Sequence, residues 1–226
     1  MIHNRLAALI FRVGSAVFAL TGILLHLFMS SDKPNFSLFV YYTLQSNLLA
    51  LALFVILGCR TAKALLREGW TGKTGYFARF EMVCVIDLLL TLVVYWVMLA
   101  PGAFSMAGGY NQSFGNIAVH LVTPLLCLID YILFTDSNHL KYRDVYLVVL
   151  YPLLYLLSST IMGYSGYVYR ISAADGKPER FPYFFFDFDR IGARSFIYIG
   201  VLIVFFLLLS HGLYLFDKKV RKPSIL

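Results

Sequence analysis

Charged side chains are scarce in this sequence of 226 residues. Asp, Glu, Lys and Arg together make up 14% of the chain, against roughly 25% in a soluble domain. Hydrophobic residues make up 60% of it, and the mean hydropathy is +0.75. A soluble fold of this size could not cover so much apolar surface, so the composition excludes a conventional globular enzyme as well as a disordered chain. The remaining class is an all-α polytopic membrane protein.

The chain also lacks the patterns of metal and nucleic-acid sites. Its three cysteines, Cys59, Cys84 and Cys127, lie in or beside apolar runs and form no Cys-x-x-Cys pair, so neither a disulfide framework nor a zinc site is indicated. No His-x-x-x-His or Gly-x-Ser-x-Gly motif is present. The formal net charge of +7 comes without a motif that reads DNA or RNA. We therefore predict no metal, no cofactor and no nucleic-acid partner.

Long apolar segments account for most of the sequence. Each is close to the ~20 residues that an α-helix needs to cross a bilayer, and together they predict a single domain, 1–226, of six transmembrane helices. The predicted helices are 6–29, 37–58, 80–100, 114–134, 144–164 and 195–216. Arg5 precedes the first segment and no small-residue cleavage pattern follows it, which indicates a retained helix. We expect the chain to reside in the cell membrane, with its oligomeric state left open.

Basic residues are distributed unequally between the two ends of these helices. One side receives Arg5, Arg60, Lys63, Arg67, Lys73, Arg79, Lys141, Arg143, Lys218, Lys219, Arg221 and Lys222. The other side receives Lys33, Arg170, Lys177, Arg180, Arg190 and Arg194. Because cytoplasmic loops carry the excess of Lys and Arg, we predict that both termini are cytoplasmic. Residues 165–194 then form an outer loop whose aromatic run indicates an interfacial anchor or, alternatively, a partial lid over an outer cavity.

Polar residues form one stripe on each of two predicted helices. Spacings of three and four residues place them on one helix face, and lipid rejects such faces, so both stripes are expected to point into the bundle. The second helix carries Thr43, Ser46, Asn47 and Ala50, and the fourth carries Asn116, His120, Thr123, Pro124 and Cys127. Thr43 and His120 each lie about six residues inside the outer helix end, ~9 Å deep at 1.5 Å per residue. The sequence therefore predicts a hydroxyl and an imidazole at one depth.

This pair indicates nucleophilic chemistry on a carbonyl. A neutral imidazole can take the proton of a hydroxyl as it attacks, and can then protonate a leaving alcohol. Asn116 or a backbone carbonyl could orient His120, and Asn47 or, less favourably placed, Gln45 could stabilise an oxyanion. Five further residues lie on the same stripes or at a similar depth in the bilayer and are predicted to line a substrate cavity. They are Ser46, His26, Tyr95, Trp96 and Thr123. In the alternative without chemistry, the Thr43 hydroxyl bonds back to the carbonyl of Phe39.

A second polar group is expected in the inner half of the bilayer. It consists of Arg12, Asp87 and Asp130. Intramembrane charges usually pair, so we interpret the group as structural ion pairs, with a proton relay as the alternative. Glu81 is expected to reach the interface.

Three short motifs resemble those of a known family. They are YYTLQSN at Tyr41–Asn47, Asn116-x-x-x-His120-x-x-x-Pro124, and FPYFFFD at Phe181–Asp187. With the six-helix outline, they resemble the androgen-induced-gene and FAR-seventeen-a-like membrane proteins and, more closely, their bacterial six-pass relatives. That resemblance implies a transmembrane threonine hydrolase in which Thr43 is the nucleophile and His120 the base, since the animal members cleave fatty acid esters of hydroxy fatty acids. The sequence departs from the animal pattern in two ways. Leu121 and Val122 replace more polar neighbours of His120, and the aromatic outer loop is longer. These differences leave the identity of the substrate open.

These observations predict a lipid-ester hydrolase or acyl transferase that acts on fatty-acyl esters in the outer leaflet, with membrane lipids as its partners. Two other classes stay open. A small-molecule or proton-coupled transporter would use the two polar layers as stations on one path, and would need a wet connection between them. A membrane binding protein without chemistry would use the same polar residues for packing alone.

Overall fold

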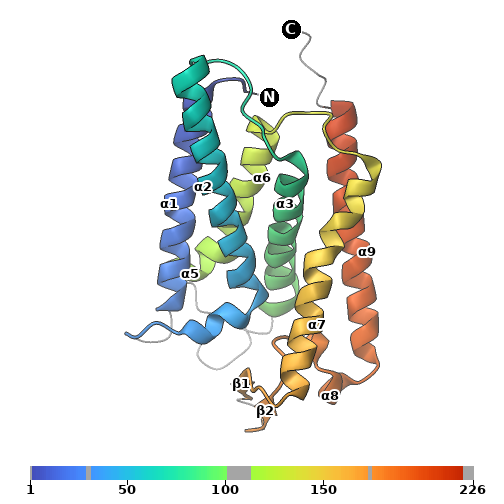
Figure 1. Ribbon diagram of the computed structural model, residues 1–226. Helices are drawn as coiled ribbons and strands as arrows, with labels where there is room; N and C mark the ends of the chain where they lie inside the picture. Colours follow the sequence, from blue (N-terminus) through green and yellow to red (C-terminus); the bar gives the residue numbers. More distant parts are fainter. Residues whose placement is uncertain (1, 29–31, 101–112, 173–174, 221–226) are drawn as a thin grey trace. The chain divides into compact units, whose positions relative to one another are not determined.

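The computed structural model describes residues 2–28, 32–100, 113–172 and 175–220 and shows an all-α integral membrane protein (Figure 1). Six helices are long and apolar enough to cross a bilayer, which confirms the predicted fold class. They are Arg5–Leu27, Tyr42–Glu68, Ala78–Leu99, Phe114–Phe134, Tyr142–Tyr164 and Arg194–Lys219. Parts of the predictions fall on Met29, residues 173–174, Arg221 and Lys222, which lie outside the described residues.

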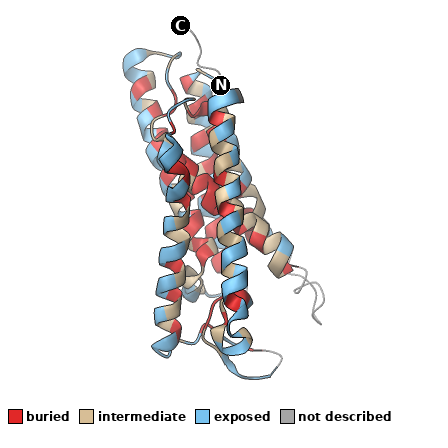
Figure 2. Cartoon of the chain, turned by 90° about the vertical axis from the view of Figure 1, so that its right-hand side faces the viewer, coloured by how far each residue is buried: buried red, intermediate tan, exposed pale blue. Residues whose placement is uncertain are grey.

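Many apolar side chains are exposed and several charged or polar ones are buried, unlike in a soluble bundle. In α1 (Arg5–Leu27), Ile10, Val13 and Val17 are exposed, whereas Arg12 and Ser15 are buried. Figure 2 shows the burial of each described residue along the helices. Lipid solvates apolar side chains and leaves buried polar groups to be satisfied by protein, so this pattern suits helices inside a bilayer.

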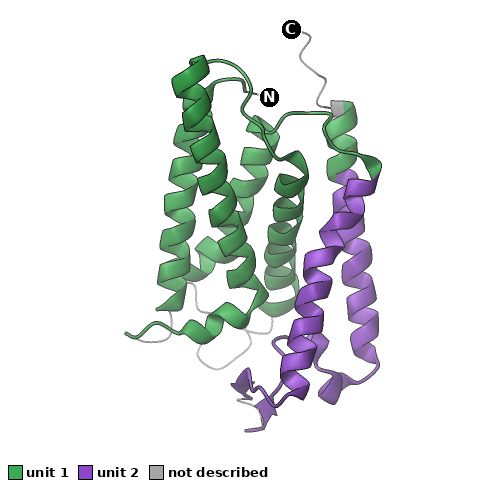
Figure 3. Cartoon of the chain, in the orientation of Figure 1, with its two compact units in different colours: residues 1–142, 213–226 green, residues 143–212 purple. Residues whose placement is uncertain are grey.

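The chain divides into two compact units, residues 1–142 with 213–226 and residues 143–212 (Figure 3). The first unit contains α1, α2 (Tyr42–Glu68), α3 (Ala78–Val93), α5 (Phe114–Ile117) and α6 (Thr123–Phe134). Contacts join α1 to α2, α2 to α3, α3 to α6, and α1 to both α5 and α6, so these helices close around one interior. A 3-10 turn, η1 (Phe36–Val40), precedes α2, and two π-helical segments, η2 (Val94–Leu99) and η3 (Ala118–Val122), continue α3 and connect α5 to α6.

The second unit is built from two long helices and the segment between them. A 3-10 helix, η4 (Tyr142–Val149), begins at the last residue of the first unit and leads into α7 (Leu150–Tyr164). Helix α9 (Arg194–Leu215) belongs to the second unit up to Gly212, and its last residues and the π-helical η6 (Phe216–Val220) belong to the first unit. The predicted outer loop contains a two-strand hairpin of β1 (Arg170–Ile171) and β2 (Pro178–Glu179), then η5 (Phe184–Phe186) and the short α8 (Phe188–Ile191). The side chain of Asp187 accepts hydrogen bonds from the amides of Asp189 and Arg190 and so caps α8. Whether this segment is an anchor or a lid stays a prediction.

Helix α2 differs most from its predicted bounds. It ends at Glu68 and not at residue 58, and Gly69, with φ of 85°, follows it. The cations beyond residue 58 were expected to mark a loop, but Lys63 and Arg67 are exposed while Thr61 and Ala64 are buried, so the helix continues with one polar face. Long basic side chains allow this because their heads reach the interface.

An ion pair in the interior of the first unit joins α1 to α6. Arg12 is fully buried, and its Nε and second guanidinium nitrogen donate to the two carboxylate oxygens of Asp130 at 2.9 and 3.2 Å. Its remaining nitrogen donates to the Thr61 hydroxyl at 2.6 Å and the Thr74 carbonyl at 2.8 Å. The predicted pairing of Arg12 with Asp130 is therefore present.

The prediction that Asp87 shares this pair is wrong. No ion pair joins Asp87 to Arg12 in the described part of the chain; instead the Tyr42 hydroxyl donates to Asp87 Oδ1 at 2.8 Å. Tyr42 contacts Asp87, and Thr61 contacts the Arg12 that pairs with Asp130. Tyr42 and Thr61 are about five turns or ~28 Å apart along α2, so Asp87 and Asp130 lie at different levels of the bundle.

Glu81 was expected at the interface, but it is buried. Its carboxylate accepts from the Thr135 hydroxyl and, at 3.0 Å, from the Phe77 amide. These two donors satisfy the carboxylate inside the protein, so the side chain has no need to reach water.

Candidate functional site

Thr43 lies at the start of α2, one residue after Tyr42. The structure thus corrects its predicted depth inside the helix, because η1 and the extended Tyr41 occupy the residues that were expected to be the first turns. If Thr43 had only a structural role, its hydroxyl was expected to donate to the Phe39 carbonyl. That carbonyl accepts instead from the Gln45 side-chain amide at 3.0 Å. The Thr43 hydroxyl lies against His120.

His120 lies in the middle of η3 and is 5% exposed. Pro124 has no amide hydrogen to donate to the carbonyl four residues earlier, which is that of His120. The Thr123 amide reaches back five residues to the Ala118 carbonyl, which is the π-helical hydrogen bond. Pro124 thus follows a segment in which the helix widens to a π turn, and such segments are frequent at functional sites.

The two nitrogens of His120 have different partners. Nδ1 lies 3.0 Å from the Asn116 carbonyl oxygen, and Nε2 lies 3.3 Å from the Thr43 hydroxyl oxygen. A carbonyl oxygen can only accept, so Nδ1 carries the hydrogen, and in a neutral ring Nε2 is then the acceptor. The Thr43 hydroxyl therefore donates to Nε2, at the long end of hydrogen-bond distance. Of the two predicted ways to orient His120, the structure uses the Asn116 backbone carbonyl.

A tyrosine ring supports the imidazole. The rings of Tyr95 and His120 stack with centroids 3.6 Å apart and an interplanar angle of 21°. The Asn116 side-chain amide donates to the Tyr95 hydroxyl, and the Trp96 ring meets the Tyr95 ring edge-on at 5.5 Å. Tyr95 and Trp96 belong to η2, so both π-helical segments contribute to the site. The sequence predicted these rings as cavity lining, but not the stack.

The amide of Asn47 has a different role from the predicted one. It is fully buried, and its nitrogen donates to the Thr43 carbonyl at 2.8 Å and to the Val119 carbonyl at 2.9 Å. Both amide hydrogens are thus in use and none is left for an oxyanion. Asn47 instead ties the residue before His120 to the residue that carries the hydroxyl. Ser46 similarly joins α2 to α3, with its hydroxyl 3.0 Å from that of Thr91.

His26 of α1 completes the group around His120. The two imidazole rings meet edge-on with centroids 5.7 Å apart, His26 is 7% exposed, and its Nδ1 has no hydrogen-bond partner among the described residues. Gly115 makes this approach possible, since a Cβ there would lie 2.5 Å from the His26 backbone nitrogen. Thr123 is also buried, but no described hydrogen bond connects its hydroxyl to Thr43 or His120.

Apolar packing holds the polar pair in place. Leu44 and Val119, the neighbours of Thr43 and His120 in sequence, pack with Ile23 and Leu27 of α1 in one buried cluster. Van der Waals packing is the main source of helix association in lipid, so this cluster fixes the spacing between α2 and η3. No group of three or more His, Cys, Asp or Glu side chains is placed to hold a metal ion within the described ranges.

A scan against protein-family models, a search of curated proteins and a search of solved structures each returned no match.

Proposed function

We propose that this protein is an intramembrane lipid-ester hydrolase in which Thr43 is the nucleophile and His120 the general base, as in the threonine hydrolase family that its motifs resemble. The observation that carries this proposal is the pair of contacts that the two nitrogens of His120 make. The Asn116 carbonyl holds the hydrogen on Nδ1, which leaves a basic Nε2 at 3.3 Å from the Thr43 hydroxyl. A general base requires such a basic nitrogen within reach of the hydroxyl that it deprotonates.

The reaction proceeds in two halves. The Thr43 oxygen bonds to the ester carbonyl carbon while its proton passes to His120 Nε2, and the resulting tetrahedral intermediate expels the alcohol, which takes the proton from Nε2. Thr43 is then acylated. Water attacks this acyl group, gives a proton to Nε2, and the Thr43 oxygen leaves with that proton as the fatty acid is released. A second alcohol in place of water would make the reaction an acyl transfer.

The start of α2 supplies the donors that an oxyanion needs. The amides in the first turn of an α-helix point out of its N-terminus and carry its partial positive charge. The Gln45 amide already donates to the Tyr41 carbonyl at 3.3 Å, so the assignment is to the amides of Thr43 and Leu44. Thr43 is the second residue of α2, so these amides adjoin the nucleophile. They replace Asn47 and Gln45 as our assignment for oxyanion stabilisation.

The environment favours a lipid substrate. Six helices are long and apolar enough to cross a membrane, where lipid acyl chains would surround them. The buried cluster of Ile23, Leu27, Leu44 and Val119 lies beside the pair. A backbone carbonyl in the third position of the triad orients the imidazole without adding a charge, which suits a bilayer where charges are costly. We place the reaction in the outer leaflet of the cell membrane and expect fatty-acyl esters as the substrate class.

A proton-coupled transporter is the second candidate, and one observation favours it. Hydrogen bonds lead from the site toward the middle of α3: Tyr42 donates to Asp87 at 2.8 Å, and Ser46 contacts Thr91 at 3.0 Å. Asp87 Oδ2 has no partner among the described side chains. A transporter would use this path but would cleave no ester.

Substituting Thr43 with valine is expected to lower ester hydrolysis roughly 10³-fold or more, because valine keeps the shape and removes the nucleophilic oxygen. The measurement is release of 4-methylumbelliferone from its oleate ester by the full chain in lipid nanodiscs. Thr160→Val is the matched control, since the Thr160 hydroxyl bonds back to the Leu156 carbonyl of its own helix at 2.7 Å. Equal rates for Thr43→Val and the wild type, or no hydrolysis by either, would refute the proposal; the second result would favour transport or binding.

A further inference from the structure

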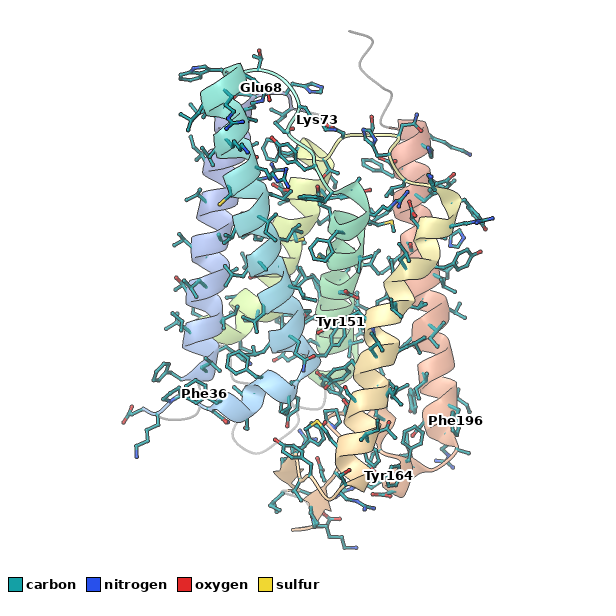
Figure 4. All side chains as sticks on the ribbon, viewed as in Figure 1. Phe36, Glu68, Lys73, Tyr151, Tyr164 and Phe196 are labelled. Atoms are coloured by element: carbon teal, nitrogen blue, oxygen red, sulfur yellow. The ribbon has the colours of Figure 1, made fainter. Side chains whose placement is uncertain are left out.

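A cavity lies in the first unit, and neither Thr43 nor His120 lines it. It has a volume of about 340 Å³, within the ~300–1,000 Å³ of small-molecule sites. Lys73, Arg79 and His139 line it together with Asp136, Phe77 and Phe80. Figure 4 shows Lys73 at the same end of this unit as Glu68, whereas Phe36, which precedes α2 and Thr43, lies at the other end.

The cavity lining carries more positive than negative charge. Lys73 and Arg79 are basic side chains, and Asp136 is the one carboxylate among the described lining residues. Asp136 Oδ2 lies 3.2 Å from Lys73 Nζ and 3.9 Å from His139 Nε2, so this carboxylate holds two basic groups at the wall. The nearest carboxylate along α3, Glu81, is occupied by Thr135 and Phe77. Among the described residues of this wall, the cationic side chains of Lys73 and Arg79 therefore outnumber the one carboxylate.

The cavity is built on closely packed backbone. A Cβ on Gly75 would lie 2.3 Å from the Asp136 backbone nitrogen, so the segment before α3 rests directly on the segment after α6. On the aromatic side, the Arg60 guanidinium lies over the Phe77 ring at 5.4 Å, and Phe80 is 42% exposed. Cations and apolar rings thus adjoin each other at the start of a membrane-spanning helix, the level of lipid headgroups.

We propose that this cavity binds the phosphate of an anionic phospholipid, with Lys73 and Arg79 as its cationic contacts and Phe80 against the first carbons of an acyl chain. Basic pockets at helix ends recognise anionic headgroups in this way. A zwitterionic lipid fits less well, because its own cation would meet the same positive wall. The site is independent of the hydrolase chemistry.

The test measures lipid binding by native mass spectrometry of the full chain in neutral detergent. Dimyristoylphosphatidylglycerol, dimyristoylphosphatidylcholine and inorganic phosphate are titrated separately. We expect phosphatidylglycerol to bind about tenfold or more tightly than phosphatidylcholine, and inorganic phosphate to compete only weakly, since it has no acyl chain. Phosphate binding as tight as phosphatidylglycerol binding would overturn the lipid assignment.

Two variants of equal charge separate the cavity from the general surface. Lys73→Gln with Arg79→Gln is expected to weaken phosphatidylglycerol binding tenfold or more, while Lys63→Gln with Arg67→Gln, on the exposed face of α2, changes it less than about twofold. All four side chains are exposed, so the fold is expected to survive, and a melting curve checks this. Equal weakening by both pairs would overturn the site in favour of nonspecific attraction. The single variant Phe80→Ala is expected to weaken lipid binding without changing phosphate binding.

Discussion

Replacing His120 with glutamine is expected to lower the rate of ester hydrolysis by about 10²–10⁴-fold, the usual contribution of a general base. The glutamine amide can still donate to the Asn116 carbonyl, as Nδ1 does at 3.0 Å, but it cannot take the Thr43 proton. We expect the loss in kcat, with a smaller change in KM, because the proton transfer belongs to the transition state. The measurement is hydrolysis of 4-methylumbelliferyl oleate in nanodiscs across substrate concentrations.

His211 offers a matched control for this variant. Its Nδ1 lies 2.7 Å from the Leu207 carbonyl, four residues earlier, which is the relation that His120 has to Asn116. His211→Gln therefore makes the same change at a histidine on α9, and we expect hydrolysis to stay within about twofold of the wild type. A rate for His120→Gln that matches the His211→Gln rate would show that His120 is a packing residue.

Replacing Arg12 with methionine is expected to destabilise the protein by about 3–5 kcal/mol, because it leaves the Asp130 carboxylate buried without its cation. Thr61 and the Thr74 carbonyl would lose their donor as well. The double variant Arg12→Met with Asp130→Leu removes both charges and should recover a large part of the loss. Unfolding of the full chain in mixed micelles measures both.

An exposed ion pair provides the comparison. Arg180 makes two hydrogen bonds to Asp189 Oδ2, at 2.9 and 2.6 Å, but both side chains are more than a third exposed. Arg180→Met is therefore expected to cost no more than about 1 kcal/mol. A small effect of Arg12→Met, or no recovery in the double variant, would contradict the assignment of Arg12 and Asp130 as the pair that stabilises the interior.

The sequence predicted the spans and the two polar stripes because each depends on a simple periodicity. Apolar length sets the membrane crossings, and spacings of three and four residues put Ser46, Asn47 and Ala50 on one buried face, as the structure shows. The same argument placed Thr43 and His120 on facing helices, and their side chains do lie in contact.

The details of the site could not be predicted, because they depend on departures from the regular helix. The π-helical segments carry His120 and Tyr95, and an apolar pattern does not distinguish a π turn from an α turn. Pro124 was the available signal, through the carbonyl that it leaves without a partner. The partner of Asp87 was also hidden, since it required knowing that the Tyr42 side chain from the next helix reaches it.

The most direct test of the account is the residue that a fluorophosphonate probe labels. Such probes form a covalent bond with an activated hydroxyl nucleophile, so the full chain in nanodiscs is treated with the probe, digested, and examined by tandem mass spectrometry. The account predicts a phosphonylated Thr43, with labelling greatly reduced in His120→Gln. Labelling that persists undiminished in Thr43→Val, or that maps to another residue, would contradict it.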